Sequence, residues 1–130
     1  MAGYPTDLRY TKNHQWLRAG EKLVTLGVTE VVNGTLGTVG FVELPYPGEL
    51  FKPGDLIGRV SAGGGSAALR MPVVGQINAV NQALADAPGP INDDPYDAGW
   101  IVRIEPGRLA DVYDLMDAEQ YETFVAEGGE

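Results

Sequence analysis

Glycine and proline interrupt this chain so often that only short elements of secondary structure can form between them. Its 130 residues include 18 glycines and 9 prolines, and short runs of alternating apolar and polar residues lie between them. This pattern is typical of an antiparallel, turn-rich β domain. We expect strands at 14–18, 23–27, 39–43, 56–61, 69–71, 76–80 and 99–105. The predicted fold class is mainly β with short helices (α+β), in a single domain over 1–130 whose core spans about 8–125.

One short helix is expected between the early strands. Thr29 is a good N-cap residue, Val31, Val32 and Leu36 follow at near-helical spacing, and Gly37 ends the segment. Further along, the stretch "NQALADAPGPIND" indicates a helical turn that runs into a long loop.

A second helix is expected near the C-terminus. Asp117 and Gln120 have the spacing of a capping box, and Tyr121, Phe124 and Val125 share one helical face. We therefore predict a C-terminal amphipathic helix that docks on the sheet, followed by a frayed tail at 127–130.

Composition excludes several classes of function. The net charge of −9 repels nucleic acid and anionic lipid, and it is consistent with a basic partner or with solubility alone. The absence of cysteine excludes disulfides, thiol catalysis and thiolate metal sites. No apolar run is long enough for a signal peptide or a membrane span, so we expect a soluble, cytoplasmic protein.

Neither a catalytic site nor a metal site is predicted, and the chain is not expected to be an enzyme. His14 is the only histidine, and because no partner for acid–base chemistry can be named, we interpret it as a structural or surface residue. The stretch "INDDPYDAGW" is dense enough in oxygen ligands to suggest calcium, but its spacing does not match an EF-hand loop. We expect a turn-rich loop anchored by Tyr96 and Trp100.

The stretch "SAGGGSAALRMPVVG" predicts a tight hairpin between two strands. Its tip would consist of Ser61, Gly63, Gly64, Gly65 and Ser66. Glycine turns the chain readily but brings no functional group. The serine hydroxyls could in principle be acylated, yet no base or known attachment motif accompanies them.

Four segments, in this order and at these separations, resemble the H protein family of the glycine cleavage system. They are "YTKNHQWLR", "LGVTEVVNGTLGTVGFVELPYPGE", "MPVVGQINAVNQAL" and "INDDPYDAGWIVRI". The resemblance covers about residues 8–125. It implies the barrel-sandwich hybrid fold of lipoyl and biotinyl domains, and a monomer.

In that family a lysine at the hairpin tip, usually within Glu-Ser-Val-Lys-Ala, carries lipoic acid. The resemblance implies that this arm accepts an aminomethyl group from the decarboxylase, delivers it to the aminomethyltransferase and is reoxidised by dihydrolipoyl dehydrogenase. Counting back from "MPVVGQINAVN" places Gly64 at the lysine position and Ser61 at the glutamate position, while Gly75 matches a family glycine in the opposite turn.

The lysines of this chain, Lys12, Lys22 and Lys52, all lie outside the tip. We therefore expect no lipoate and no other cofactor. Three hypotheses follow: a non-lipoylated binding, regulatory or scaffold protein for glycine cleavage or lipoate-handling enzymes, a carrier that uses a different attachment residue, and a structural adaptor. We favour the first, because the family sequence is kept around a tip that lacks the amine.

Overall fold

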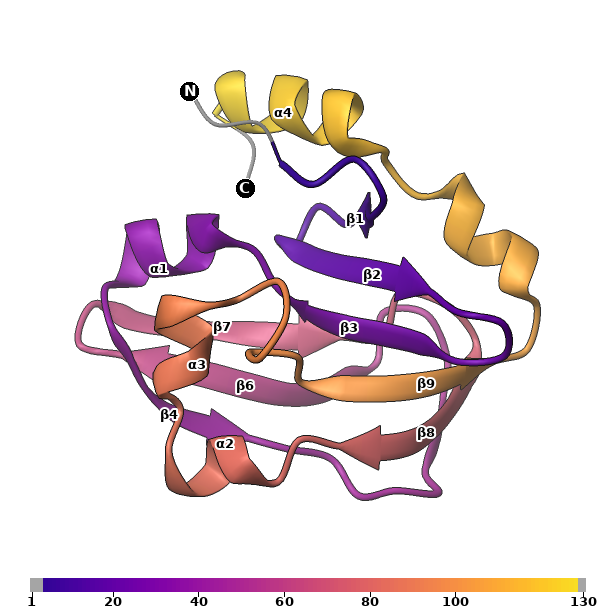
Figure 1. Ribbon diagram of the computed structural model, residues 1–130, viewed down its shortest axis with the longest axis horizontal. Helices are drawn as coiled ribbons and strands as arrows, with labels where there is room; N and C mark the ends of the chain where they lie inside the picture. The colour runs from indigo at the N-terminus through magenta and orange to yellow at the C-terminus, as the bar shows by residue number, and fades with distance from the viewer. Residues whose placement is uncertain (1–3, 129–130) are drawn as a thin grey trace.

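The computed structural model describes residues 4–128, and within them nine strands form two antiparallel sheets (Figure 1). The six-stranded sheet has the order β1-β2-β3-β9-β8-β5, and the three-stranded sheet has the order β4-β6-β7. The strands are β1 (Arg9–Tyr10), β2 (Gln15–Ala19), β3 (Val24–Val28), β4 (Val39–Glu43), β5 (Leu50–Phe51), β6 (Leu56–Ala62), β7 (Gly65–Arg70), β8 (Gly75–Val80) and β9 (Val102–Pro106).

The main core contains side chains from both sheets, as a barrel-sandwich hybrid requires. Strand β9 shows the principle: Val102 and Ile104 are buried, while Arg103 and Glu105 between and after them are exposed. Each buried aliphatic side chain contributes about 1.5–3 kcal/mol. The core draws on both sheets and includes Leu17, Leu26, Val42, Val60, Leu69, Ile77, Val102 and Ile104. The expected fold class is confirmed.

Both outer edges of the three-stranded sheet are bound by a side-chain amide. On β7, the Gln15 side chain donates to the Arg70 carbonyl and accepts from the Arg70 N–H, each at 2.8 Å. On β4, the Asn92 side chain accepts from the Val39 N–H at 2.8 Å and donates to the Val39 carbonyl at 3.1 Å. A carboxamide presents one donor and one acceptor, so it satisfies one residue of an edge strand as a neighbouring strand would.

The two predicted helices form where expected. Helix α1 (Glu30–Leu36) begins directly after Thr29, whose hydroxyl accepts a hydrogen bond from the Val31 N–H. Helix α4 (Ala118–Ala126) begins with the complete capping box of Asp117 and Gln120. Tyr121 on its buried face stacks on Tyr10 with 4.6 Å between ring centroids, so α4 docks on β1 as an amphipathic helix should.

Elsewhere the expectations were incomplete. The helical turn predicted within "NQALADAPGPIND" is confirmed as α2 (Ala83–Asp86), but the long loop predicted after it is wrong, because a second short helix forms there, α3 (Gly89–Asp93). The 3-10 helix η1 (Leu109–Asp114) and the two-residue strands β1 and β5 were not predicted. Such short elements have no detectable periodicity and depend on their tertiary contacts. Of the predicted frayed tail, residues 129–130 lie outside the described part of the chain.

Candidate functional site

The tip of the β6–β7 hairpin is narrower than the sequence suggested. Ala62 pairs with Gly65, and Ser61 pairs with Ser66, so only Gly63 and Gly64 form the turn itself. The serines are therefore strand residues on either side of a two-residue turn. The tip lies beside α1 at one end of the molecule (Figure 1).

Gly64 is held against the last residue of α1. Its N–H donates to the Leu36 carbonyl at 3.0 Å, one of the helix C-terminal carbonyls that has no partner within the helix. A Cβ atom at position 64 would lie 2.7 Å from that carbonyl oxygen, closer than van der Waals contact permits. Gly65 has a φ of +138°, which disfavours other residues, whereas a Cβ at Gly63 would meet nothing within 4 Å. Of the three glycines, only Gly63 stands where a side chain fits without strain.

Gly75, the other glycine singled out in the sequence, has a packing role. It begins β8 and pairs with Phe51 on one side and Pro106 on the other. A Cβ there would lie 2.7 Å from the Glu105 carbonyl oxygen and 2.9 Å from a methyl carbon of Ile104. Glycine at this position therefore permits close pairing of β8 with β9.

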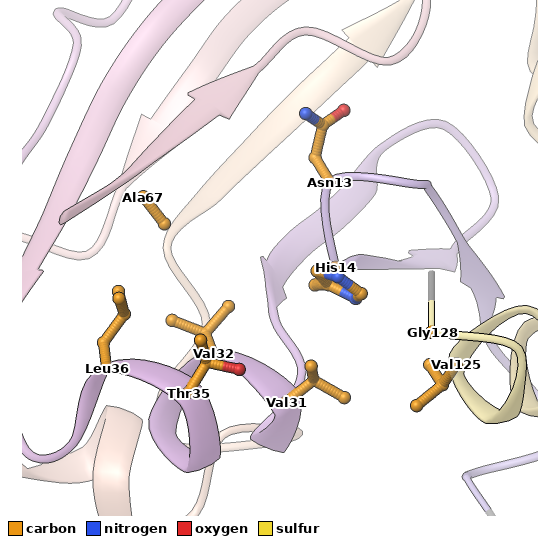
Figure 2. Close-up of a pocket in the computed structure, with 9 residues that line it drawn as sticks. All are labelled: Asn13, His14, Val31, Val32, Thr35, Leu36, Ala67, Val125 and Gly128. Carbon is orange, nitrogen blue, oxygen red and sulfur yellow. The ribbon is translucent and has the colours of Figure 1, made fainter. Parts of the chain in front are cut away.

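A cavity of about 490 Å³ lies beside the hairpin (Figure 2). Its volume is within the range of small-ligand sites. Its apolar wall comes from α1, β7 and α4, and its polar groups come from the turn before β2 and from α1. The lining residues are Asn13, His14, Val31, Val32, Thr35, Leu36, Ala67, Val125 and Gly128. None of them carries a permanent charge.

His14 is part of a hydrogen-bonded chain at the edge of this cavity. Its Nδ1 lies 2.7 Å from the Tyr121 hydroxyl, which lies 2.7 Å from the buried Thr29 hydroxyl. Burial raises the pKa of Tyr121, so its hydroxyl stays protonated at neutral pH. His14 itself has a φ of +64°, a conformation that costs free energy in a non-glycine residue. These contacts connect β2, α1 and α4, which agrees with a structural interpretation of His14.

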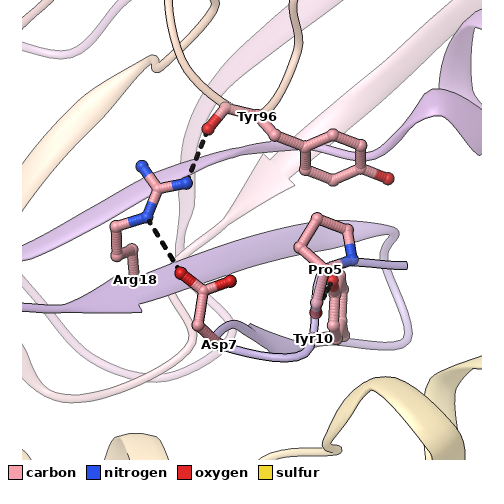
Figure 3. Close-up of polar contacts among 5 residues, drawn as sticks. All are labelled: Pro5, Asp7, Tyr10, Arg18 and Tyr96. Atoms are coloured by element: carbon pink, nitrogen blue, oxygen red, sulfur yellow. Dashed lines mark hydrogen bonds and ion pairs between the residues drawn. The ribbon is translucent and has the colours of Figure 1, made fainter. Parts of the chain in front are cut away.

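The stretch predicted as a turn-rich loop is anchored by its aromatic residues. The Arg18 side chain donates to the Tyr96 carbonyl at 2.8 Å and lies 3.9 Å from the Asp7 carboxylate (Figure 3). The Tyr96 hydroxyl donates to Glu30, and burial together with this bond raises the pKa of Tyr96. Trp100 stacks under Arg103 at 4.2 Å. The loop therefore ties the N-terminal segment, α1 and β9 together.

Two oxygen-bearing side chains of this loop make hydrogen bonds within the fold. Asn92 bonds the β4 backbone, as described above, and Asp94 accepts from the Ala98 N–H at 3.2 Å. Between residues 4 and 128, no three His, Asp or Glu side chains come together in a group that could hold a metal ion. The same part of the chain contains no helix long and apolar enough to cross a bilayer.

The comparisons with known proteins decide the family. The model of the glycine cleavage H-protein family matches residues 8–128. The chain belongs to the glycine cleavage H-protein family. It is 42% identical over 123 residues to the glycine cleavage system H protein of Anaeromyxobacter sp. (strain K), covering 95% of this chain and 96% of that protein. Identity to the H protein of Listeria monocytogenes serotype 4b (strain CLIP80459) is 40% over 118 residues, with coverages of 91% and 94%.

A solved structure extends this agreement to three dimensions. The crystal structure of the H protein from Mycobacterium marinum matches with a TM-score of 0.84 and 34% identity, covering 96% of this chain and 99% of that one. The resemblance drawn from the four sequence segments is thus confirmed, and so is the fold that it implied.

Sequence reasoning missed two features of the site, the cavity and the contact between Gly64 and Leu36. Both join segments that are far apart in the chain, and neither has a local signature. The only available signal was Gly37, whose φ of +95° ends α1 and brings the Leu36 carbonyl to the hairpin.

Proposed function

We propose that this chain is a non-lipoylated member of the H-protein family, and that it binds enzymes of glycine cleavage or lipoate handling as a regulator or scaffold. The family carries lipoate. The observation behind the proposal is that the tip turn consists of Gly63 and Gly64 and presents no amine. Lipoyl attachment requires a primary amine as nucleophile, and a backbone amide is not one.

The residues at the tip do not fit lipoate. Position 64, which counting back from "MPVVGQINAVN" places at the carrier lysine, has no room for a Cβ beside the Leu36 carbonyl. Lys12 lies in the turn before β2, Lys22 between β2 and β3, and Lys52 after β5, all outside the hairpin. The rest of the family fold is retained, with a TM-score of 0.84 to a solved H protein, and this supports retention of a surface that family enzymes recognise.

Intact mass spectrometry tests the absence of the modification. The full chain is co-expressed with a lipoyl ligase and supplied with lipoate, alongside a lysine-bearing H protein as the positive control. We expect the mass of the unmodified chain while the control gains the lipoyl group. A lipoyl adduct on this chain would favour a carrier with a different attachment residue and overturn the proposal.

Calorimetry with the purified enzymes tests the binding role. The chain is titrated separately into aminomethyltransferase, glycine decarboxylase, dihydrolipoyl dehydrogenase and the lipoyl ligase. Saturable binding to at least one of them is expected. No binding to any of the four would leave the structural adaptor as the better description.

A pair of lysine variants asks whether the tip alone has diverged. Ser61→Glu is combined with either Gly64→Lys or Gly63→Lys and tested in the same lipoylation assay. Because only position 63 has open space, we expect the Gly63→Lys variant to fold like the parent and the Gly64→Lys variant to be destabilised. Failure of both variants to accept lipoate would show that the ligase-facing surface has changed as well.

A further inference from the structure

Strand β7 is an edge strand whose outer side is only partly covered. It pairs with β6 on one side, and none of the strands within residues 4–128 pairs with it on the other. Successive residues of an antiparallel strand direct their backbone N–H and C=O groups alternately to the two sides. Arg70 directs both groups away from β6, since they bond the Gln15 side chain. Ala68 and Ser66 lie two and four residues before Arg70 on the same strand, so their N–H and C=O groups also point away from β6.

The outward groups of Ser66 and Ala68 are available. Within residues 4–128, no hydrogen bond to another residue occupies them. Ser66 is exposed and Ala68 is half-buried, so water reaches this part of the edge. Two N–H and two C=O groups thus stand in the arrangement that a neighbouring strand would bond.

The cavity described above reaches this edge at Ala67, between Ser66 and Ala68. Ala67 of β7 lies on one side of the cavity, and Asn13 and His14 lie on the other (Figure 2). Residues of α1 and of the end of α4 complete the lining. Adjacent strands lie about 4.8 Å apart, so a strand added at this edge would run beside Ala67, which lines the cavity.

Both ends of the opening are closed by bonds within the fold. At the tip, Gly64 is bonded to the Leu36 carbonyl, and at the other end Gln15 is bonded to Arg70. The free edge between them covers Ser66 to Ala68, which suits a short extended segment. The Gln15 carboxamide already bonds this edge as a peptide group of an added strand would.

We propose that this opening binds an extended peptide segment of another protein, which adds to β7 through Ser66 and Ala68 and places one aliphatic side chain in the cavity. Main-chain hydrogen bonds supply affinity in this mode of recognition, and a pocket for alternate side chains supplies specificity. Val32, Leu36 and Ala67 form the apolar lining that the side chain would contact. The inference rests on the proposed binding function and assigns a contact to it.

Charge indicates which segment fits. The carboxyl end of α4 reaches the cavity at Val125, and helix carboxyl ends have partial negative charge. The chain as a whole has a net charge of −9. A second copy would bring the same charge to the contact, so we expect a neutral or basic segment from a different protein.

The test uses a displayed library of random heptapeptides, selected on the immobilised full-length chain. We expect the enriched peptides to be neutral or basic, to have alternating aliphatic residues and to lack a central proline. With a synthetic copy of an enriched peptide and the isotope-labelled chain, the amide protons of Ser66 and Ala68 should shift and exchange more slowly with solvent.

Three variants make the test specific. Ala68→Pro removes an outward N–H without removing a bond to β6, and it should weaken peptide binding about tenfold, the effect of one lost hydrogen bond. Ala67→Leu places a larger side chain in the cavity and should weaken binding independently, which covers the case in which the proline variant does not fold. Ser61→Ala lies on β6, outside the proposed contact, and is the control, expected to bind as the parent does.

Several results would overturn the inference. They are the absence of enriched peptides, binding that neither Ala68→Pro nor Ala67→Leu weakens, and self-association in which the Ser66 and Ala68 amides become protected without peptide. Enzyme binding without peptide binding would overturn this edge assignment and leave the proposed function standing. Peptide binding without enzyme binding would overturn the proposed function and leave the edge assignment standing.

Discussion

At position 64 the backbone leaves room for a hydrogen atom and for no side chain. The Gly64 N–H completes the end of α1, and a Cβ would approach the Leu36 carbonyl oxygen to 2.7 Å. The glycine therefore contributes to the fold itself. Adjacent Gly63 has no such neighbour, so the two turn residues differ in what they tolerate although they are chemically identical.

Alanine variants at positions 63 and 64 should differ in stability for this reason. Gly64→Ala is expected to lower the free energy of unfolding by about 1–3 kcal/mol, because the Leu36 carbonyl must shift. Gly63→Ala is the matched control, expected to change it by no more than about 0.5 kcal/mol. Urea unfolding followed by tryptophan fluorescence measures both. Equal losses of unfolding free energy at the two positions would show that the contact between Gly64 and Leu36 does not stabilise the fold.

Three tyrosines couple the fold to alkaline pH. Burial raises the pKa of Tyr10, Tyr96 and Tyr121 above the ordinary value of 10.0. The folded state therefore retains phenolic protons that the unfolded chain releases above about pH 10. The stabilisation of the fold by these protonated phenols is complete below about pH 10 and decreases above it.

We expect the free energy of unfolding to fall by up to about 1.4 kcal/mol per pH unit for each such tyrosine above pH 10. Denaturant titrations from about pH 8 to about pH 11.5 span the onset of phenol ionisation. They measure the slope of the free energy of unfolding against pH. Tyr121→Phe should make the slope shallower, whereas Tyr46→Phe, at a side chain that is 76% exposed, should leave it unchanged. A slope that both variants share with the parent would contradict the assignment.

At the scale of elements, α4 depends on its first turn and on its buried aromatic face. Asp117 accepts from the Gln120 N–H at 2.8 Å, and the Gln120 side chain accepts from the Asp117 N–H at 2.9 Å. Tyr121 then packs between Tyr10 and Tyr4. The helix has nine residues, too few to be stable alone in water, so capping and docking must act together.

Asp117→Ala should lower the free energy of unfolding by about 1 kcal/mol, the usual effect of losing an N-cap side chain. Glu122→Ala, at an exposed position of the same helix, is the control and should have little effect. Thermal unfolding followed by circular dichroism compares the two. If both variants unfold with the parent, the capping box contributes nothing to stability.

At the scale of the whole molecule, the two sheets are joined across an edge by one buried side chain. Gln15 belongs to the six-stranded sheet and bonds Arg70 of the three-stranded sheet through both ends of its carboxamide. It is fully buried, and water does not readily replace bonds made at such a position.

Gln15→Ala should therefore lower the free energy of unfolding by about 1–3 kcal/mol. Gln76→Ala is the control: the Gln76 side chain makes one surface bond, to the Gly48 carbonyl at 3.0 Å, and its loss should cost less than about 1 kcal/mol. Urea denaturation measures both effects. A Gln15 variant as stable as the Gln76 variant would show that the sheets are held by core packing alone.

The amino-acid sequence by itself determined the local features. Alternation and glycine or proline punctuation predicted most of the longer strands, and the spacing of Asp117 and Gln120 predicted the start of α4. The sequence also determined that the hairpin tip has no side-chain amine, since Gly63 and Gly64 have no side chain. These features depend on residues close together in the chain, whose interactions follow from backbone geometry and periodicity.

Only the tertiary structure decided what surrounds the tip. The contact of Gly64 with Leu36, the bridge from Gln15 to Arg70 and the cavity between α1, β7 and α4 all join segments distant in sequence. Their geometry follows from how the two twisted sheets and the short helices pack together, and no local pattern specifies it. In the sequence, Gly64 shows only that a side chain is absent. In the fold, it makes a close backbone contact with Leu36.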